Sequence, residues 1–286
     1  MTTLPFKQVD VFTGAPFRGN PVAVVIGADA LSTEEMQRIA GWTNLSETTF
    51  VLAPSAPEAD YLLRIFTPRA ELPFAGHPTI GSAHAVLESG FARARNGRLR
   101  QECGAGVLEL AAEGEKLWVT APRATVAKLD ARYVDVLASA IGTTVSTAPL
   151  MVSVGPIWLV VDLGDAATVD GLEPDMEAVG HLSESLSITG ITVFGAAGQG
   201  EAAMHVRSFA PAHGVPEDPV CGSGNISVAT YLGRSGLLPR YGMQYTSRQG
   251  MQLGRDGRVS LRVGDAGAIE LGGHAVTCVD GTLRVR

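Results

Sequence analysis

The stretch FAGHPTIGSAHAVLESG, which runs from Phe74 to Gly90, decides the fold because a later stretch resembles it. That later stretch reads VCGSGNISVATYLGRSG and runs from Val220 to Gly236. Aligned without gaps, the two share a glycine at the third position (Gly76 and Gly222), an isoleucine at the seventh, an alanine at the tenth and a final Ser-Gly. Each begins with small residues and continues as an apolar run, which predicts two similar helices.

The resemblance extends upstream, where Arg64-Ile-Phe-Thr-Pro is echoed by Arg207-Ser-Phe-Ala-Pro. Each half of the chain therefore carries a strand, a Pro-containing loop, a small-residue turn, an apolar helix and a Ser-Gly stop. Two copies are too few for a solenoid, so the duplication predicts two similar domains that face each other. We expect them at residues 1–124 and 125–286. The last strand, 276–286, either stays with the second domain or crosses back to the first.

Composition favours a folded chain that is rich in strands. Hydrophobic residues make up 45% of the 286 residues and charged residues 18%, which is enough apolar material for a sizeable core. Short β-branched runs such as VAVVIG, TTFVL, IWLVVDL and VSLRV recur between turn signals. We therefore expect an α+β fold in which each domain is a curved β-sheet or barrel around one central helix, the two domains being related by a pseudo-twofold.

Three further helices are expected. Ser32-Thr-Glu-Glu forms a capping box before an apolar run, so the first of them starts at Ser32. The second starts near Asp130, and the third lies between Glu173 and Leu186.

Charge and motif content exclude several classes of function. The net charge of -7 argues against nucleic acid, and no basic run suits an anionic membrane. The first residues lack the pattern of a signal peptide, and no apolar run reaches the length of a spanning helix. The cysteines Cys103, Cys221 and Cys278 are too scattered for a disulfide framework or a zinc site. We expect a cytoplasmic protein without a bound metal.

Both repeated helices open on very small residues, Ala75-Gly76 in one and Cys221-Gly222 in the other. Small residues let a ligand reach the free N–H groups of a helix start, where a carboxylate is favoured by the helix dipole. The alternative is that the small residues only allow close packing of the helices.

Four polar residues are candidates for the chemistry, and each has a structural alternative. Glu47 stands where a helix gives way to a strand, and His77 opens the first repeated helix, whose dipole favours its neutral form. Asp218 either orients His77 or orders its own loop by capping N–H groups. Ser223 aligns with His77 and either donates a hydrogen bond to a substrate or is an ordinary helix-start residue.

Several motifs together carry a resemblance to a known family. They are Asp10-Val-Phe-Thr, Gly19-Asn-Pro-Val-Ala-Val, Asn44-Leu-Ser-Glu-Thr-Thr-Phe, Phe66-Thr-Pro-Arg-Ala-Glu-Leu-Pro-Phe-Ala-Gly-His-Pro-Thr-Ile-Gly, and Phe209-Ala-Pro through Glu217-Asp-Pro-Val-Cys-Gly-Ser-Gly-Asn. They occur in order over most of the chain. The sequence resembles the phenazine-biosynthesis isomerase (PhzF-like) family, which shares the diaminopimelate epimerase fold.

The resemblance implies two facing domains with the site in the cleft, which agrees with the duplication. It implies Glu47 as the acid/base, with His77, Asp218 and Ser223 around the substrate. Gly76 and Gly222 would lend backbone N–H groups to the substrate carboxylate. Members of the family are commonly homodimers and use no metal or organic cofactor, so we expect both of this chain.

Position 221 departs from the family pattern, which usually has threonine where this chain has Cys221. Racemases and epimerases of the same fold pair a cysteine there with another at the facing helix start, but the facing position here is Ala75. A two-thiol mechanism is therefore not available. Cys221 is either a small buried substitute for threonine, which we favour, or a thiolate activated by the helix start.

The predicted function is isomerisation of a small carboxylate by proton transfer through Glu47, without a cofactor. The alternatives are a racemase or epimerase that uses Cys221, and a protein that binds a metabolite without catalysis. A nucleotide-dependent oxidoreductase is disfavoured: the loop Gly198–Ala203 loosely fits a dinucleotide motif, but a strand follows it where a helix is required. A hairpin turn explains that loop better.

Overall fold

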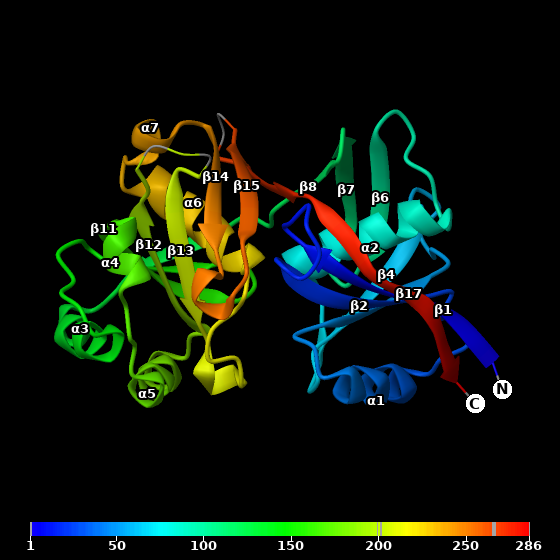
Figure 1. The fold of residues 1–286 in the computed structure, drawn as a ribbon, viewed down its shortest axis with the longest axis horizontal. Helices are drawn as coiled ribbons and strands as arrows, with labels where there is room; N and C mark the ends of the chain where they lie inside the picture. The colour runs from blue at the N-terminus through cyan, green and yellow to red at the C-terminus, as the bar shows by residue number, and fades with distance from the viewer. Residues whose placement is uncertain (1, 199, 201, 265–266, 286) are drawn as a thin grey trace. The chain divides into compact units, whose positions relative to one another are not determined.

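The computed structural model describes residues 2–198, 200, 202–264 and 267–285. The chain divides into two compact units, one formed by Met1–Thr120 with Gly272–Arg286 and the other by Ala121–Leu271. In each unit one long helix lies against a sheet, α2 in the first and α6 in the second (Figure 1). The C-terminal strand thus belongs to the first unit.

In the described part of the first unit, eight strands form one continuous sheet, and the short strand β5 pairs with β4. Its helices are α1 (Thr33–Thr43) and α2 (Gly76–Ser89). Its strands are β1 (Thr2–Val11), β2 (Asn20–Ile26), β3 (Thr48–Leu52), β4 (Tyr61–Phe66), β5 (Glu71–Leu72), β6 (Arg98–Cys103), β7 (Gly106–Glu113), β8 (Lys116–Thr120) and β17 (Ala275–Val285).

The second unit has more short helices around a comparable set of strands. Its helices are α3 (Val134–Ile141), α4 (Ala166–Asp170), α5 (Met176–Leu186), α6 (Gly222–Arg234) and α7 (Leu238–Tyr241), with 3-10 turns η1 (Ala131–Tyr133), η2 (Pro211–His213) and η3 (Met251–Leu253). Its strands are β9 (Thr125–Lys128), β10 (Leu150–Ser153), β11 (Ile157–Asp165), β12 (Gly190–Ala196), β13 (Met204–Phe209), β14 (Gln244–Gln249) and β15 (Gly257–Val263), and β16 (Ile269–Gly273) runs across the boundary.

Strand pairing repeats between the units in the same order of directions. In the first unit β17, β1, β2, β3, β4, β6 and β7 pair in turn as antiparallel, antiparallel, parallel, antiparallel, parallel and antiparallel neighbours. In the second unit β9, β10, β11, β12, β13, β14 and β15 follow the identical succession. The prediction of two similar domains is therefore confirmed by their topology.

The central helices α2 and α6 are buried along almost their whole length. Helix α2 contacts β1, β2, β3, β4, β8 and β17, and helix α6 contacts β10, β11, β12 and β15. Matching polar bonds tie each helix to its sheet. Gln101 on β6 donates to Thr79 of α2, and Ser247 on β14 is bonded to Asn225 of α6. The sheet of each unit therefore fixes the position of its central helix.

The three other expected helices are confirmed. Ser32 caps α1 through a capping box with Glu35. Asp130 caps η1, which leads directly into α3, and α5 lies within the range predicted from Glu173 to Leu186. The segment Gly198–Ala203 joins the antiparallel neighbours β12 and β13, as a hairpin connection does, although residues 199 and 201 lie outside the described part.

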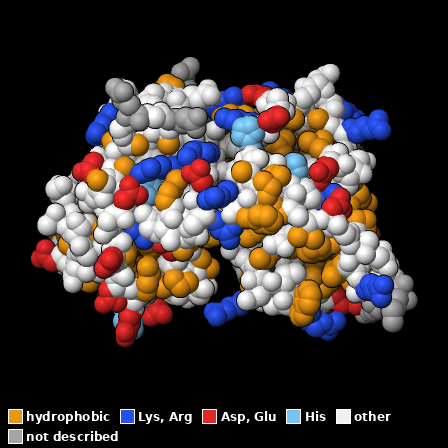
Figure 2. Space-filling model, viewed as in Figure 1, with side chains coloured by type: hydrophobic (Ala, Val, Ile, Leu, Met, Phe, Trp, Pro, Cys, Tyr) orange, Lys and Arg blue, Asp and Glu red, His pale blue; other side chains and the backbone are white. Residues whose placement is uncertain are grey.

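The surface is mixed in charge. On the face shown in Figure 2, acidic and basic side chains are interspersed, with hydrophobic side chains between them. Among the helices that the structure describes, none is both long and apolar enough to span a membrane.

Close packing of α2 on the strands generates a stability prediction. A Cβ added at Gly81 would lie 2.5 Å from a methyl group of Val22 and 2.8 Å from one of Val11. We expect Gly81→Ala to lower the free energy of unfolding by about 1–3 kcal/mol, because stiff β-branched neighbours have to move. Chemical denaturation measures it.

Gly233 of α6 is the matched control, because nothing lies within 4 Å of the Cβ that it would gain. Gly233→Ala should be neutral or stabilise by up to about 1 kcal/mol through helix propensity. A Gly81→Ala protein as stable as the parent would contradict the packing of α2 described above.

Candidate active site

The first turn of α2 is buried and has no side-chain cap. Ala75 is the N-cap residue in extended conformation, and its methyl group accepts no hydrogen bond. The amides of Gly76 and His77 have no acceptor within the helix, as for the first residues of any α-helix. Both residues are buried. These amides are the part of the unit best suited to bind an anion.

Glu47 lies beside this helix start. It immediately precedes β3, and its Oε2 is 3.5 Å from Nε2 of His77. The side chains of Glu47 and His77 are 16% and 6% exposed, so the carboxylate is the more accessible of the two. A carboxylate in contact with a buried imidazole is an arrangement that suits proton transfer.

His77 is held in its neutral form. Burial lowers its pKa to about 3, although a hydrogen bond to the backbone of Pro21 works in the opposite direction. A neutral imidazole has one N–H donor and one lone pair. If the donor serves the carbonyl of Pro21, Nε2 turns its lone pair towards Glu47 and can accept a hydrogen bond from that carboxyl when it carries a proton.

The loop before Pro21 is fixed by Asp10, which explains two motifs in the sequence. One carboxylate oxygen of Asp10 accepts from the backbone N–H groups of Arg18 (2.7 Å) and Gly19 (2.9 Å). Gly19 itself has no room for a side chain, because an added Cβ would meet the carbonyl of Val11 at 2.1 Å. Sequence reasoning missed the part of Pro21, because nothing local connects it with His77.

The start of α6 matches that of α2 in position and differs in chemistry. Cys221 is the N-cap residue, and its sulfur accepts from the N–H of Gly224 at 3.2 Å. A side chain at Gly224 would meet the hydroxyl oxygen of Ser208 at 2.6 Å, so the third helical residue has to be small. The amides of Gly222 and Ser223 again lack acceptors within the helix.

Cys221 is a buried thiol, and the hydrogen bonds from Ser223, Gly224 and Ser208, which favour a thiolate, are outweighed. Burial raises its pKa well above the usual value, and the charge of Asp218 raises it further. The thiol is hydrogen-bonded to the Asp218 carboxylate. The alternative of an activated thiolate, which the helix start alone suggested, is therefore not supported, since burial outweighs the dipole.

Ser223 has a partner that the sequence did not reveal. The indole N–H of Trp158, on β11, donates to the hydroxyl oxygen of Ser223 at 2.9 Å. Because this hydrogen bond uses the oxygen as an acceptor, the hydroxyl proton of Ser223 points elsewhere. Cys221 Sγ at 3.5 Å is one position within its reach.

Asp218 closes the loop before α6. Its Oδ1 accepts from the N–H of Val220 at 3.0 Å, the loop-capping role that was one of the two predicted for it. Gln249 supports the same loop: its amide donates to the carbonyl of Asp218 at 3.0 Å and accepts from the N–H of Cys221 at 3.1 Å. Burial is the largest cause that raises the pKa of Asp218 to about 6, while the bonds to Cys221 and Val220 lower it.

The residues predicted for the site thus form two groups, one in each unit. Glu47, Gly76 and His77 lie together in the first, and Asp218 and the helix start Cys221–Ser223 lie together in the second. Pro21, Trp158 and Gln249 join them. The functional roles of these residues stay predictions. In the described ranges, no group of three or more His, Cys, Asp or Glu side chains could hold a metal ion.

The raised pKa of Asp218 predicts a variant that is more stable than the parent. Its carboxyl titrates at about 6 in the folded chain against an ordinary 3.8, so the unfolded chain loses the proton first and stability falls as pH rises through this window. Asp218→Asn removes that cost. We expect it to be more stable than the parent by about 1–3 kcal/mol at pH 8 and equal to it near pH 4.

Denaturation of both proteins across this pH range gives the difference. Effects of other titrating groups cancel, because the two proteins share them. A difference that does not vary with pH would show that Asp218 ionises in the folded chain as it does in the unfolded one.

Comparisons with known proteins agree over nearly the whole chain. Residues 9–281 match the family described as "Phenazine biosynthesis-like protein". The chain is 43% identical to "Antisense-enhancing sequence 1" of Schizosaccharomyces pombe, over 98% of this chain and 99% of that protein. It is 38% identical to trans-2,3-dihydro-3-hydroxyanthranilate isomerase of Pseudomonas chlororaphis, over 96% and 97% of the two chains.

The fold agrees as well. The crystal structure of a PhzF-family phenazine biosynthesis protein of Bacillus anthracis superposes with a TM-score of 0.87 at 27% identity and covers 100% of both chains. The resemblance read from the sequence motifs is thereby confirmed. From the length of these matches and the shared architecture, the chain belongs to the phenazine biosynthesis-like (PhzF) family and is an isomerase.

Proposed function

We propose that this isomerase moves a proton between two carbons of a small unsaturated carboxylate, without a cofactor, and that the substrate is held between the two units. The observation that carries the proposal is the contact of Glu47 with a neutral, buried His77 at the first turn of α2. A base, a proton relay and a group of open amides therefore lie within one small region.

The reaction begins when the Glu47 carboxylate removes a proton from an activated carbon of the substrate. A C–H bond breaks, an O–H bond forms on Glu47, and the electron pair delocalises towards the substrate carboxylate. The amides of Gly76 and His77 stabilise the negative charge that develops there. Glu47, or His77 after receiving the proton through Nε2, then protonates a different carbon, and the double bond has moved. Nothing is oxidised or reduced overall.

The second unit supplies substrate contacts and a second ionisable group. The amides of Gly222 and Ser223 and the hydroxyl of Ser223 donate to the substrate. Asp218, with its pKa raised to about 6, carries a proton in part of the population near neutral pH and can accept or donate a hydrogen bond. Cys221 stays a thiol and serves as a donor to Asp218.

The substrate class follows from the named relatives. The Pseudomonas chlororaphis protein is a trans-2,3-dihydro-3-hydroxyanthranilate isomerase, and we propose a ring-bearing dihydro carboxylate of this kind for the present chain. The named compound is the first probe. The homodimer expected from the family resemblance stays a prediction, and so does the absence of a metal and of an organic cofactor.

Glu47→Gln tests the assignment of the base. The amide cannot accept a proton, so we expect turnover of trans-2,3-dihydro-3-hydroxyanthranilate to fall by about 10²–10⁴-fold while its binding changes by less than about tenfold. Turnover and equilibrium binding are measured separately.

Glu58→Gln is the matched control, because Glu58 is an exposed carboxylate of the same unit. It should leave turnover unchanged. Near-normal activity of Glu47→Gln would reject the role of Glu47, and an equal loss in both variants would point to a general effect of charge.

Cys221→Ser separates this mechanism from a racemase that uses Cys221. A serine hydroxyl can still donate to Asp218 and accept from Gly224, so we expect isomerase turnover within about tenfold of the parent. A thiol acid/base would lose about 10²–10⁴-fold. A loss of that size would favour the racemase.

The same reactions run in deuterated solvent address the third alternative. Deuterium in the product shows that the chain catalyses proton transfer. A protein that only binds a metabolite would leave the compound unlabelled.

A further inference from the structure

An arginine–glutamate pair closes the loop before the central helix in both units. In the first unit Arg64, on β4, donates through Nε (2.7 Å) and Nη2 (2.6 Å) to the two carboxylate oxygens of Glu71. In the second unit Arg207, on β13, makes the same two bonds to Glu217, both at 2.9 Å. Each glutamate precedes the N-cap residue of its helix by four positions.

The two pairs correspond in further detail. The Arg64 guanidinium lies 5.1 Å from the ring of Phe66, and that of Arg207 lies 5.0 Å from the ring of Phe209. The third nitrogen of each arginine reaches a different helix: Nη1 of Arg64 donates to Thr33 at the start of α1, whereas Nη1 of Arg207 donates to backbone carbonyls at the end of α4. The arginine–glutamate pair is therefore a feature that both units share.

Burial distinguishes the second pair from the first. The side chains of Arg207 and Glu217 are 5% and 8% exposed, against 23% and 39% for Arg64 and Glu71. A two-bonded arginine–carboxylate pair removed from water has a fixed geometry, and loss of one partner leaves an unpaired buried charge. Arg207 and Glu217 are thus the more rigid pair.

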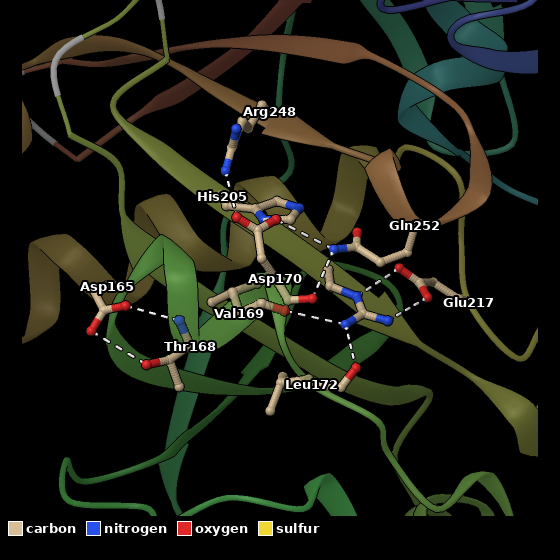
Figure 3. Close-up of polar contacts among 10 residues, drawn as sticks. Asp165, Thr168, Val169, Asp170, Leu172, His205, Glu217, Arg248 and Gln252 are labelled. Carbon is tan, nitrogen blue, oxygen red and sulfur yellow. Dashed lines mark hydrogen bonds and ion pairs between the residues drawn. The ribbon is translucent and has the colours of Figure 1, made fainter.

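A network of polar contacts holds in place the backbone segment to which Arg207 donates (Figure 3). Nη1 of Arg207 lies 3.2 Å from the carbonyl oxygen of Val169 and 2.9 Å from that of Leu172. Asp170, between them, lies 2.8 Å from Nη2 of Arg248 and 2.8 Å from Nδ1 of His205. Burial lowers the pKa of His205 to about 4, so His205 is neutral near pH 7. Arg248 therefore balances the charge of Asp170, and Glu217 balances the charge of Arg207.

Glu217 is joined directly to Asp218 in the chain. The N–H of Asp218 donates to the carbonyl of Ser208 on β13 at 2.9 Å, and its own carbonyl accepts from Gln249. The loop is therefore held by hydrogen bonds at the successive residues Glu217 and Asp218. The Arg207–Glu217 pair is the first of these contacts along the loop. In the first unit the residue after Glu71 is Leu72, which has no charge to influence.

From this geometry we infer that Arg207 and Glu217 are positioning residues, which fix the Asp218 loop and hold a negative charge beside the Asp218 carboxylate. The effect on turnover rests on the function proposed above, whereas the effect on Asp218 does not. Burial is the largest cause that raises the pKa of Asp218. The bonds from the Cys221 thiol and the Val220 N–H lower it, and the charge of Glu217 raises it by the smallest amount.

Titration of Asp218 in the Glu217→Gln variant tests the inference. Carboxyl carbon-13 shifts are followed against pH in the full chain, and Asp218→Asn identifies the resonance. Glu217→Gln removes the negative charge and leaves the positive charge of Arg207 uncompensated. We expect the pKa of Asp218 to fall from about 6 by less than about one pH unit, because the charge of Glu217 is the smallest of the causes that act on it. The acidic limb of the pH profile for turnover should move by the same amount.

Glu71→Gln is the matched control, because it breaks the same kind of pair where no acid follows. It should leave the titration of Asp218 unchanged. An unchanged titration in folded Glu217→Gln would overturn the inference, and so would an equal shift in both variants.

The double variant Arg207→Met with Glu217→Leu keeps the inference testable if the single change prevents folding. Apolar replacement of a buried pair is often neutral for stability, so this protein should fold. We expect backbone amides of residues 218 and 220 to exchange with solvent about tenfold faster than in the parent, with a loss of turnover. Parental exchange rates would overturn the positioning role.

The titration and the exchange measurement need no substrate. If the parent does not isomerise the test compound and both measurements behave as expected, the proposed function fails and the inference about Arg207 and Glu217 stands. If the parent isomerises the compound and the pKa of Asp218 is unchanged in Glu217→Gln, the proposed function stands and the inference about Arg207 and Glu217 fails.

Discussion

The first turn of an α-helix has backbone N–H groups without acceptors in the helix, and the candidate site is built around this constraint. Helix α1 solves it with its own side chains, since Ser32 and Glu35 cap each other's backbone. Helix α2 does not solve it: Ala75 provides no cap, although Gly76 and His77 are buried. A buried donor without an acceptor costs free energy. In the function proposed above, the substrate carboxylate would offset that cost when it binds.

The duplication preserves this architecture and changes its chemistry. Strand directions, central helices and the arginine–glutamate pairs recur in both units. The side chains at matching positions do not recur: His77 aligns with Ser223, and Leu72 aligns with Asp218. One unit therefore holds the Glu47 carboxylate beside a neutral imidazole, and the other holds a carboxylate of raised pKa beside a thiol. Such a division suits a reaction in which the proton leaves and enters at different atoms.

Much of the fold could be predicted because its signals are local. Short β-branched runs between turn signals marked many strands, and the capping residues Ser32 and Asp130 marked helix starts. The repeated small-residue turns located both helix starts of the candidate site. The contacts that complete the site are long-range and left no local signal. Pro21 bonds His77, Trp158 bonds Ser223 and Gln249 bonds Cys221, yet none of these residues stands out in its own strand. Glu217 could have been found, because Glu71 occupies the matching position of the repeat.

The pairing of β1 with β17 has a consequence for the order of folding. Thr2 lies opposite Val285 and Val11 opposite Ala275, so β1 is completed by a strand that lies more than 260 positions later in the sequence. On a ribosome, all of Ala121–Leu271 emerges before β17 does, and the second unit can form while one edge of β1 is still bare. An open strand edge invites pairing with other chains. A nascent chain of this protein thus carries an open strand edge until β17 has been synthesised and pairs with β1.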